Sequence, residues 1–107
     1  MKKDEIKAYV HRNRVADVVN ALINAGFKNL TVIDVQGMLQ ALDGKEQHYS
    51  VEIGQKVVTE VKLELVCDNQ TQTAEAVAII REQAKTGQSS AGWIYVSEIQ
   101  SAIEITN

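Results

Sequence analysis

The chain has 107 residues, of which 45% are apolar, and it carries a formal net charge of −3 at pH 7 and one cysteine. This size predicts a single domain over residues 1–107, and the acidic balance excludes a protein that binds nucleic acid through a basic surface. A lone cysteine excludes an intrachain disulfide. Because no apolar run is long enough for a membrane span or a signal peptide, we expect a cytoplasmic protein without direct membrane insertion.

The first part of the chain predicts a strand followed by a helix. Residues 6–11 alternate weakly in hydrophobicity and are rich in strand formers. Asn13 is the candidate N-cap of the helix, and Gly26 stands where a residue in left-handed conformation would end it. The expected core stripe follows helical spacing and consists of Val15, Val18, Val19, Leu22 and Ile23.

A second strand is predicted over residues 30–36, and it stops at Gly37. Residues 38–55 show no sustained period and contain a turn signal at Asp43-Gly44. A loop of this length inside a compact domain is usually functional, although an extension of both flanking strands into a hairpin remains the alternative. The candidate partner-binding residues of this loop are Asp43, Glu46, His48, Tyr49 and Glu52.

The third strand is predicted over residues 57–67, where mostly apolar residues recur at every second position. One face of the strand is apolar, and the other carries Glu60, Lys62 and Glu64. This pattern is typical of an antiparallel sheet with one core face and one face that is wet or forms an interface.

The last part of the chain predicts a second helix and two short strands. Capping residues at 68–73 begin a helix that runs to about Lys85 and that Gly87 terminates. A fourth strand covers residues 93–96, and residues 99–106 are expected to hold a turn and a final edge strand. The core stripe of the helix consists of Thr73, Ala76, Val77, Ile80 and Ala84.

The predicted order is β-α-β-β-α-β, an α+β arrangement of the ferredoxin-like, split βαβ type. In this fold two helices cover one face of an antiparallel sheet and leave the other face open. We expect Val58, Val66 and Trp93 to point toward the open face, and therefore expect the chain to self-associate.

The glycine-punctuated loop at 85–96 allows two interpretations. Glycines let a backbone approach a phosphate and surround it with N–H groups. The same composition also serves as a plain turn between a helix and a strand.

Enzymatic and metal-binding motifs are poorly represented. No Cys-x-x-Cys pair or other spaced ligand motif occurs, so a metal sensor built from Glu46, His48 and Glu52 is an alternative only. An acylphosphatase-type enzyme would use Arg12 or Arg14, but the glycine-rich phosphate loop expected beside them is missing. We therefore predict a protein that is not an enzyme.

The chain resembles the PII signalling proteins over nearly its whole length. The resemblance rests on motifs in the first helix and second strand, the third strand, and a threonine-glycine loop before the fourth strand. These motifs are residues 17–22, Gly26, residues 30–32, 35–37 and 61–66, Lys85-Thr86-Gly87, Gly92, Ile94 and Val96. The segments at 8–14 and 91–97 resemble, more narrowly, the divergent members associated with heavy-metal efflux pumps.

This resemblance implies a homotrimer with small-molecule clefts between subunits. Its ligands would be ATP, ADP and 2-oxoglutarate, and a loop at about 39–55 would contact a membrane transporter or a metabolic enzyme. The implied ligand-cleft residues are Thr31, Gly37, Glu64, Val66, Thr86, Gly87, Gly92 and Trp93.

Several family positions that bind phosphate or magnesium are substituted. Each lost charge-assisted contact would cost about 1.5–3 kcal/mol, which removes most triphosphate affinity. The sequence therefore predicts a regulatory or sensor protein with a degenerate nucleotide site; retained weak binding of ATP, ADP or AMP is the alternative. Two family lysines fall on Trp93 and Glu60, two arginines on Glu104 and Thr106, the Gly-Asp turn on Ser90-Ala91, and a loop glutamine on Ala41.

Overall fold

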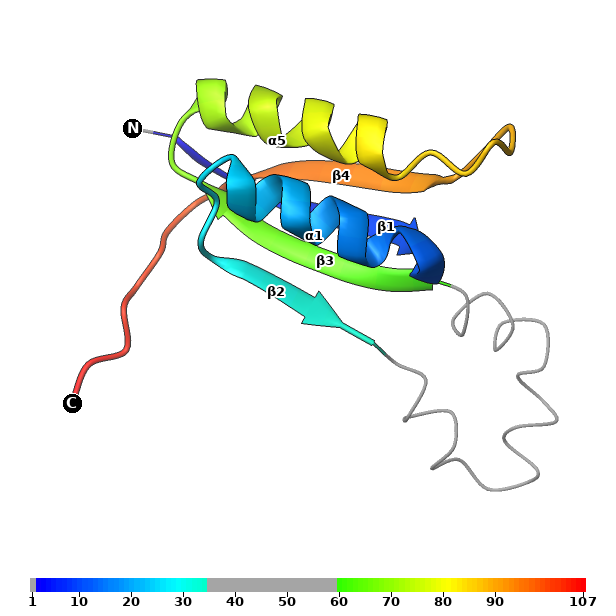
Figure 1. Ribbon diagram of the computed structural model, residues 1–107. Helices are drawn as coiled ribbons and strands as arrows, with labels where there is room; N and C mark the ends of the chain where they lie inside the picture. Colours follow the sequence, from blue (N-terminus) through cyan, green and yellow to red (C-terminus); the bar gives the residue numbers. More distant parts are fainter. Residues whose placement is uncertain (1, 35–59) are drawn as a thin grey trace, which may run out of the picture.

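The computed structural model describes residues 2–34 and 60–107. In this part of the chain one antiparallel sheet, ordered β2-β3-β1-β4, carries both α-helices on one face (Figure 1). This arrangement confirms the predicted ferredoxin-like fold. The elements are β1 (Lys3–His11), η1 (Arg12–Arg14), α1 (Val15–Asn24), β2 (Leu30–Ile33), β3 (Glu60–Cys67), α5 (Gln70–Gln83) and β4 (Gly92–Ile99).

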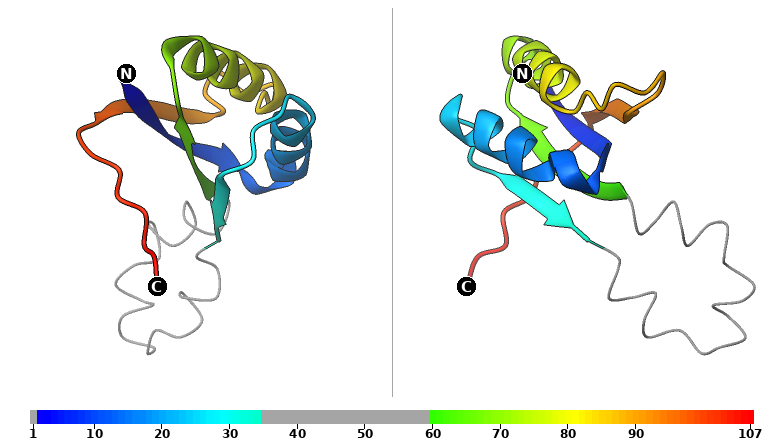
Figure 2. Two further views of the ribbon diagram at one scale, coloured as in Figure 1. Left: turned by 90° about the vertical axis from the view of Figure 1, so that its left-hand side faces the viewer. Right: turned by 45° about the vertical axis from the view of Figure 1, so that its right-hand side comes forward.

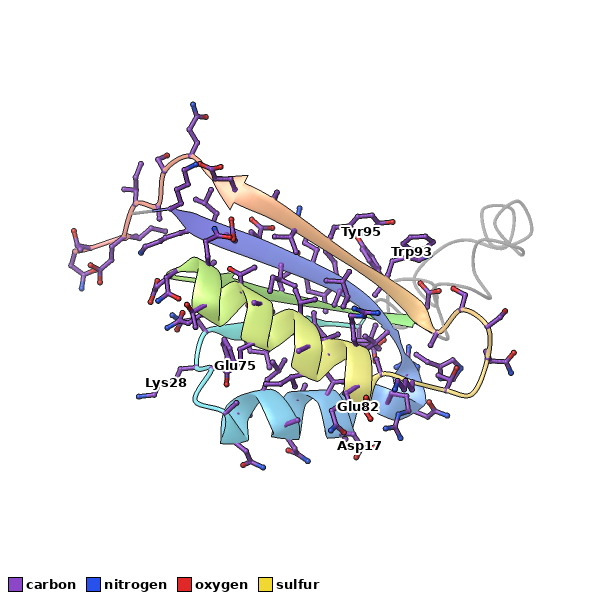
Figure 3. The ribbon with its side chains drawn as sticks, turned by 90° about the horizontal axis from the view of Figure 1, so that it is seen from above. Asp17, Lys28, Glu75, Glu82, Trp93 and Tyr95 are labelled. Atoms are coloured by element: carbon purple, nitrogen blue, oxygen red, sulfur yellow. The ribbon has the colours of Figure 1, made fainter. Side chains whose placement is uncertain are left out.

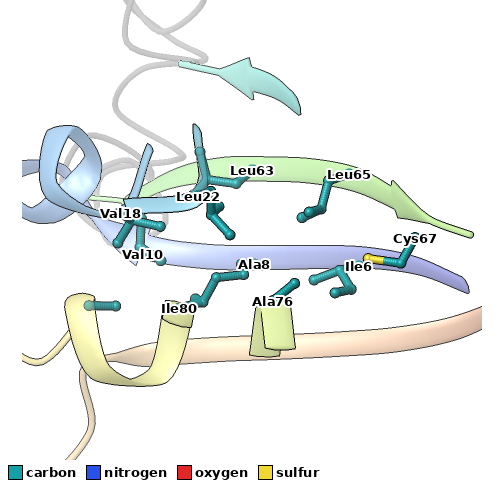
Figure 4. Close-up of a cluster of buried hydrophobic side chains, with 11 residues drawn as sticks. Ile6, Ala8, Val10, Val18, Leu22, Leu63, Leu65, Cys67, Ala76 and Ile80 are labelled. Carbon is teal, nitrogen blue, oxygen red and sulfur yellow. The ribbon is translucent and has the colours of Figure 1, made fainter. Parts of the chain in front are cut away.

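The core lies between the two central strands and the helices (Figure 4). Every second residue of β1 and β3 is buried beneath the helices, which confirms the alternation predicted for the third strand. Each fully buried large aliphatic side chain contributes about 1.5–3 kcal/mol to folding. The cluster consists of Ile6, Ala8, Val10, Val18, Leu22, Leu63, Leu65, Cys67, Ala76, Ile80 and Ala84.

The start of α1 differs from the prediction. Asn13 does not cap this helix, because the 3-10 turn η1 is inserted between β1 and α1. Arg14 occupies the N-cap position and makes no side-chain capping hydrogen bond. The backbone N–H of Asn13 instead donates to Nδ1 of His11, at 3.3 Å, which caps η1.

The end of α1 is as predicted. Gly26 has φ of +97°, a conformation that residues with a Cβ rarely adopt. Its N–H donates to the carbonyl of Ile23, and the N–H of Phe27 donates to that of Leu22, both at 3.0 Å. This pair of bonds is a Schellman motif.

The prediction that Ile23 belongs to the core stripe of α1 is wrong, because this residue is 56% exposed.

The helix α5 buries its predicted stripe and is tied to β1 at its first turn. The hydroxyl of Thr73 donates to the carboxylate of Asp4 at 2.9 Å, and the side-chain amide of Gln70 donates to the same oxygen at 3.0 Å. The helix ends at Gln83 with Ala84 as C-cap. The prediction that Gly87 terminates it is therefore wrong, because this glycine lies further along, in the loop that leads to β4.

The strand β4 is longer than predicted and pairs with β1 along its whole length. The predicted final edge strand at 99–106 is wrong: Ile99 ends β4, and residues 101–107 form no regular structure. This tail leaves the sheet and runs away from the helices (Figure 2), and it exposes Ile103 and Ile105 almost completely. No helix in the described ranges is long and apolar enough to cross a membrane.

Candidate functional site

The helix-free face of the sheet carries rows of side chains that the strand register defines. Tyr9 lies between Lys62 of β3 and Trp93 of β4, and in the next row Lys7 lies between Glu64 and Tyr95. Residues directly opposite on neighbouring strands point to the same side of a sheet. The predicted placement of Trp93 and Val66 on this open face is thereby confirmed, whereas Val58 lies outside the described residues.

Trp93 and Tyr95 extend from β4 (Figure 3), and with Tyr9 of β1 they form a cluster of three aromatic rings. The rings of Trp93 and Tyr95 are stacked, with centroids 6.4 Å apart and planes at 14°. Tyr9 meets Tyr95 edge to face at 5.9 Å, and the ammonium of Lys62 lies 6.0 Å from the centroid of Tyr9. The Trp93 side chain remains 60% exposed and that of Tyr95 54%.

The charges of this face form ion pairs along the strands. Lys62 contacts Glu64 at 2.7 Å, and Lys7 contacts Glu5 at 3.3 Å. The hydrogen bond from Lys62 lowers the pKa of Glu64, and the same bond raises the pKa of Lys62. The helix-free face is thus aromatic along β4, whereas the lysines of β1 and β3 on this face are each paired with a glutamate of the same strand.

A cleft of about 400 Å³ lies at the corner of the sheet where β4 begins; we call it the Trp93 cleft. Its lining, within the described residues, contains the carboxylate of Glu60 and no lysine or arginine. The residues that line it are His11, Asn13, Glu60, Thr86, Gln88, Ser90, Ala91, Gly92 and Trp93. Trp93 also contributes to the lining of a neighbouring cleft of about 440 Å³ between α5 and β4, where Arg81, Glu82 and Lys85 supply the charged groups.

Gly92 positions Trp93 because the backbone of β1 passes very close to it. Its φ is +146°, and a Cβ at this position would lie 2.1 Å from the carbonyl oxygen of Tyr9. Only glycine fits such an approach. The strand therefore enters the sheet with Trp93 held opposite Tyr9.

The two arginines considered for phosphate chemistry are both engaged by carboxylates. Arg12 forms a bidentate pair with Asp34, and Arg14 pairs with Asp17 at 2.8 Å. Arg14 also donates to the carbonyl of Gln83, at 2.9 and 2.7 Å, and so binds the end of α5. Burial raises the pKa of the Cys67 thiol, which therefore behaves as a core side chain rather than a nucleophile.

The structure divides the predicted ligand-cleft residues into two groups. Thr86, Gly92 and Trp93 line the Trp93 cleft, and Gly87 lies in the same loop with φ of +86°. Toward the opposite edge of the sheet, Thr31 of β2 pairs with Glu64 of β3, two residues from Val66. Strand β1 lies between β3 and β4, so one subunit does not join the two groups.

The remaining predicted site residues lie outside the described residues. They are Gly37 of the cleft and Asp43, Glu46, His48, Tyr49 and Glu52 of the loop. The described ranges contain no group of three or more His, Cys, Asp or Glu side chains that could hold a metal ion. The proposed metal ligands Glu46, His48 and Glu52 therefore remain a prediction.

Sequence reasoning missed His11, Asn13 and Gln88 as cleft residues. His11 faces Glu60 across the β1–β3 register, 49 positions apart in the chain. For His11, the only signal was the pairing of the first and third strands that a ferredoxin-like fold implies, and a single sequence does not reveal its register. Gln88 lies in the glycine-containing loop at 85–96, where no pattern marked it individually.

The chain matches, over residues 1–107, the family model described as nitrogen regulatory protein P-II. Nitrogen regulatory protein P-II 1 of Methanothermobacter thermautotrophicus is 30% identical over 103 residues, which cover 94% of this chain and 87% of that protein. The P-II protein of Nostoc punctiforme is 30% identical over 105 residues, covering 98% and 91%. The crystal structure of Arabidopsis thaliana PII bound to citrate superposes with a TM-score of 0.63 at 28% identity, over 89% of this chain and 75% of that one.

Proposed function

Since this chain belongs to the nitrogen regulatory protein P-II family, we propose that it is a non-catalytic regulator that works as a homotrimer and has lost most of its affinity for nucleotide phosphates. The observation that carries the proposal is the Trp93 cleft, whose described lining has one carboxylate and no lysine or arginine. A triphosphate in this place would lack the charge-assisted hydrogen bonds that hold phosphates in proteins. We expect this regulator to act in the cytoplasm.

The trimer would account for the face that the helices leave uncovered. Tyr95 and Val66 are 54% and 40% exposed there, beside charges that are already paired. Association would remove this apolar surface from water, at about 25 cal/mol for each Å² buried. It would also bring Thr31 and Glu64 of one subunit toward the Trp93 cleft of another. The predicted ligand-cleft residues, which lie in two separate groups in one subunit, would then meet between two subunits.

Partner contact is assigned to the segment at 39–55, which lies outside the described residues. The support for this assignment is the family resemblance together with the acidic and aromatic composition of the segment. The partner class to test first is a membrane transporter or an efflux pump from the same organism. Replacement of 39–55 by a short Gly-Ser linker should abolish binding of that purified partner and leave the oligomeric state unchanged.

Two measurements on the purified protein test the proposal directly. Light scattering at micromolar concentration should give three times the chain mass of 11.8 kDa, and a monomer would refute the trimer. Calorimetric titration with ATP, ADP and AMP should show no binding tighter than millimolar. A micromolar dissociation constant for ATP would refute the loss of phosphate affinity.

A further inference from the structure

The indole of Trp93 is a ready surface for stacking a planar ligand. In one subunit Trp93 is 60% exposed, its ring stacks on Tyr95, and the residue lines the Trp93 cleft. The stacking on Tyr95 and the close approach of Gly92 to Tyr9 hold the ring in place. A pre-positioned aromatic wall binds a ring at little entropic cost.

The charge of the Trp93 cleft selects against anions. Glu60 supplies a carboxylate to the lining, whereas Lys62 on the same strand and Arg12 after β1 are paired with Glu64 and Asp34. Arg81 of α5 lines the neighbouring cleft and not this one. The other polar groups of the lining are uncharged amides and hydroxyls together with His11. On the side of α5, Lys85 is paired with Glu82 at 2.9 Å.

We propose that the Trp93 cleft binds a planar cation, that is, an aromatic or heteroaromatic ring carrying a positive charge. The ring would stack on Trp93, the best cation–π partner among side chains, and Glu60 would compensate the charge. Amides at the rim, such as that of Gln88, are suited to hydrogen-bond ring substituents. This inference rests on the proposed function, because it names the ligand class of the cleft that has lost its phosphate contacts.

A series of three equally sized rings tests the charge preference. The probes are 1-methylnicotinamide, which is cationic, nicotinamide, which is neutral, and nicotinate, which is anionic. Trp93 is the only tryptophan of the chain, so a saturable change in its fluorescence, beyond the collisional quenching that each probe gives with N-acetyltryptophanamide, reports binding beside this residue. The cation should bind roughly tenfold tighter than the neutral ring, with nicotinate the weakest. Equal affinity for all three, or a preference for nicotinate, would overturn the proposal.

Two variants locate the effect within the cleft. Glu60→Gln should bring the affinities for 1-methylnicotinamide and nicotinamide close together while both still quench Trp93. Glu98→Gln, which removes an exposed carboxylate at the far end of β4, should keep the full preference. An unchanged preference in Glu60→Gln, or its loss in Glu98→Gln, would contradict the assignment.

A third variant separates this inference from the proposed function. In calorimetric titrations, the Trp93→Lys variant should no longer bind 1-methylnicotinamide, and it should bind ATP more tightly than the unaltered protein does. If the variant still binds 1-methylnicotinamide with the original affinity, the stacking role of Trp93 is refuted. Tight ATP binding by the unaltered protein would instead refute the proposed function, whatever the ring series shows.

Discussion

The two faces of the sheet, which are built from alternate residues of the same strands, have opposite characters. On the helix-covered face, Ile6 and Leu63 are fully excluded from water. On the helix-free face, their chain neighbours Lys7 and Glu64 form ion pairs, and Tyr95 of β4 is more than half exposed.

This difference separates what holds one subunit together from what the subunit presents to other molecules. Apolar burial under the helices is the dominant favourable contribution to folding. The exposed aromatic rings and paired charges contribute little to the fold of one subunit, because surface ion pairs are worth about 0–1 kcal/mol. They are available for association and for ligand binding.

The largest expected effect comes from truncating the covered face. Leu63→Ala should lower the free energy of unfolding by about 2–5 kcal/mol, because it leaves a cavity in the core. Val66→Ala, on the helix-free face of the same strand, should cost less than about 1 kcal/mol in the isolated subunit. Urea unfolding of both variants, at a protein concentration low enough to dissociate the trimer, measures the contrast in the free energy of unfolding. Similar losses would show that the two faces share the stabilisation of the subunit.

A smaller loss is expected where β4 meets β1. Gly92→Ala should destabilise by about 2–3 kcal/mol, because the new Cβ meets the carbonyl of Tyr9 in a backbone conformation that favours glycine. Gly26→Ala is the matched control, since its φ is also positive but no atom lies within 4 Å of the new Cβ. It should cost about 1–2 kcal/mol. Thermal unfolding of the two variants compares their losses of stability. Equal losses would show that the close approach of Gly92 to Tyr9 adds nothing to the cost of a positive φ.

Assembly should respond to the helix-free face alone. Tyr95→Asp places a carboxylate in the proposed interface and should weaken the trimer by about 1–3 kcal/mol per contact. Ile23→Asp, at a similarly exposed position on α1, should leave the trimer intact. Sedimentation velocity over a dilution series measures the stability of the trimer in both variants. Dissociation of the Ile23 variant alone would show that the subunits associate through the helices instead.

The smallest expected effect is the pH dependence of one ion pair on the free face. Lys62 lowers the pKa of Glu64 in the folded protein, so the contribution of this pair to stability is present above the ordinary glutamate pKa of about 4.3 and disappears as the pH falls through the lowered value. Glu64→Gln should flatten the dependence of the urea midpoint on pH between neutral and acid conditions. A slope unchanged by the substitution would show that the pair does not contribute.

The candidate site was predictable in part. The threonine-glycine loop and Trp93 could be assigned from local composition and from the family resemblance, and Thr86, Gly92 and Trp93 do line one cleft. His11 and Asn13 could not, because they reach this cleft only through the pairing of β1 with both β3 and β4.

Errors in the predicted elements occurred at their ends. Asn13 is a good capping residue by type, but the chain inserts a 3-10 turn before α1. Ile23 follows the helical period, yet the covered stripe is narrower than the apolar one. Residues 101–106 have strand-like composition, but no neighbouring strand in the described chain pairs with them.

The sequence by itself determined which residues share a side of each strand and helix, because the periods of two and 3.6 follow from local backbone geometry. It thereby determined the order of the elements and most of the core positions on the helices and the third strand. The tertiary structure alone decided which residues meet across the sheet and at its corner, such as Glu60 with His11 and Tyr9 with Trp93. Strand register and close backbone approaches depend on the packing of segments far apart in the chain, and local propensity does not encode them.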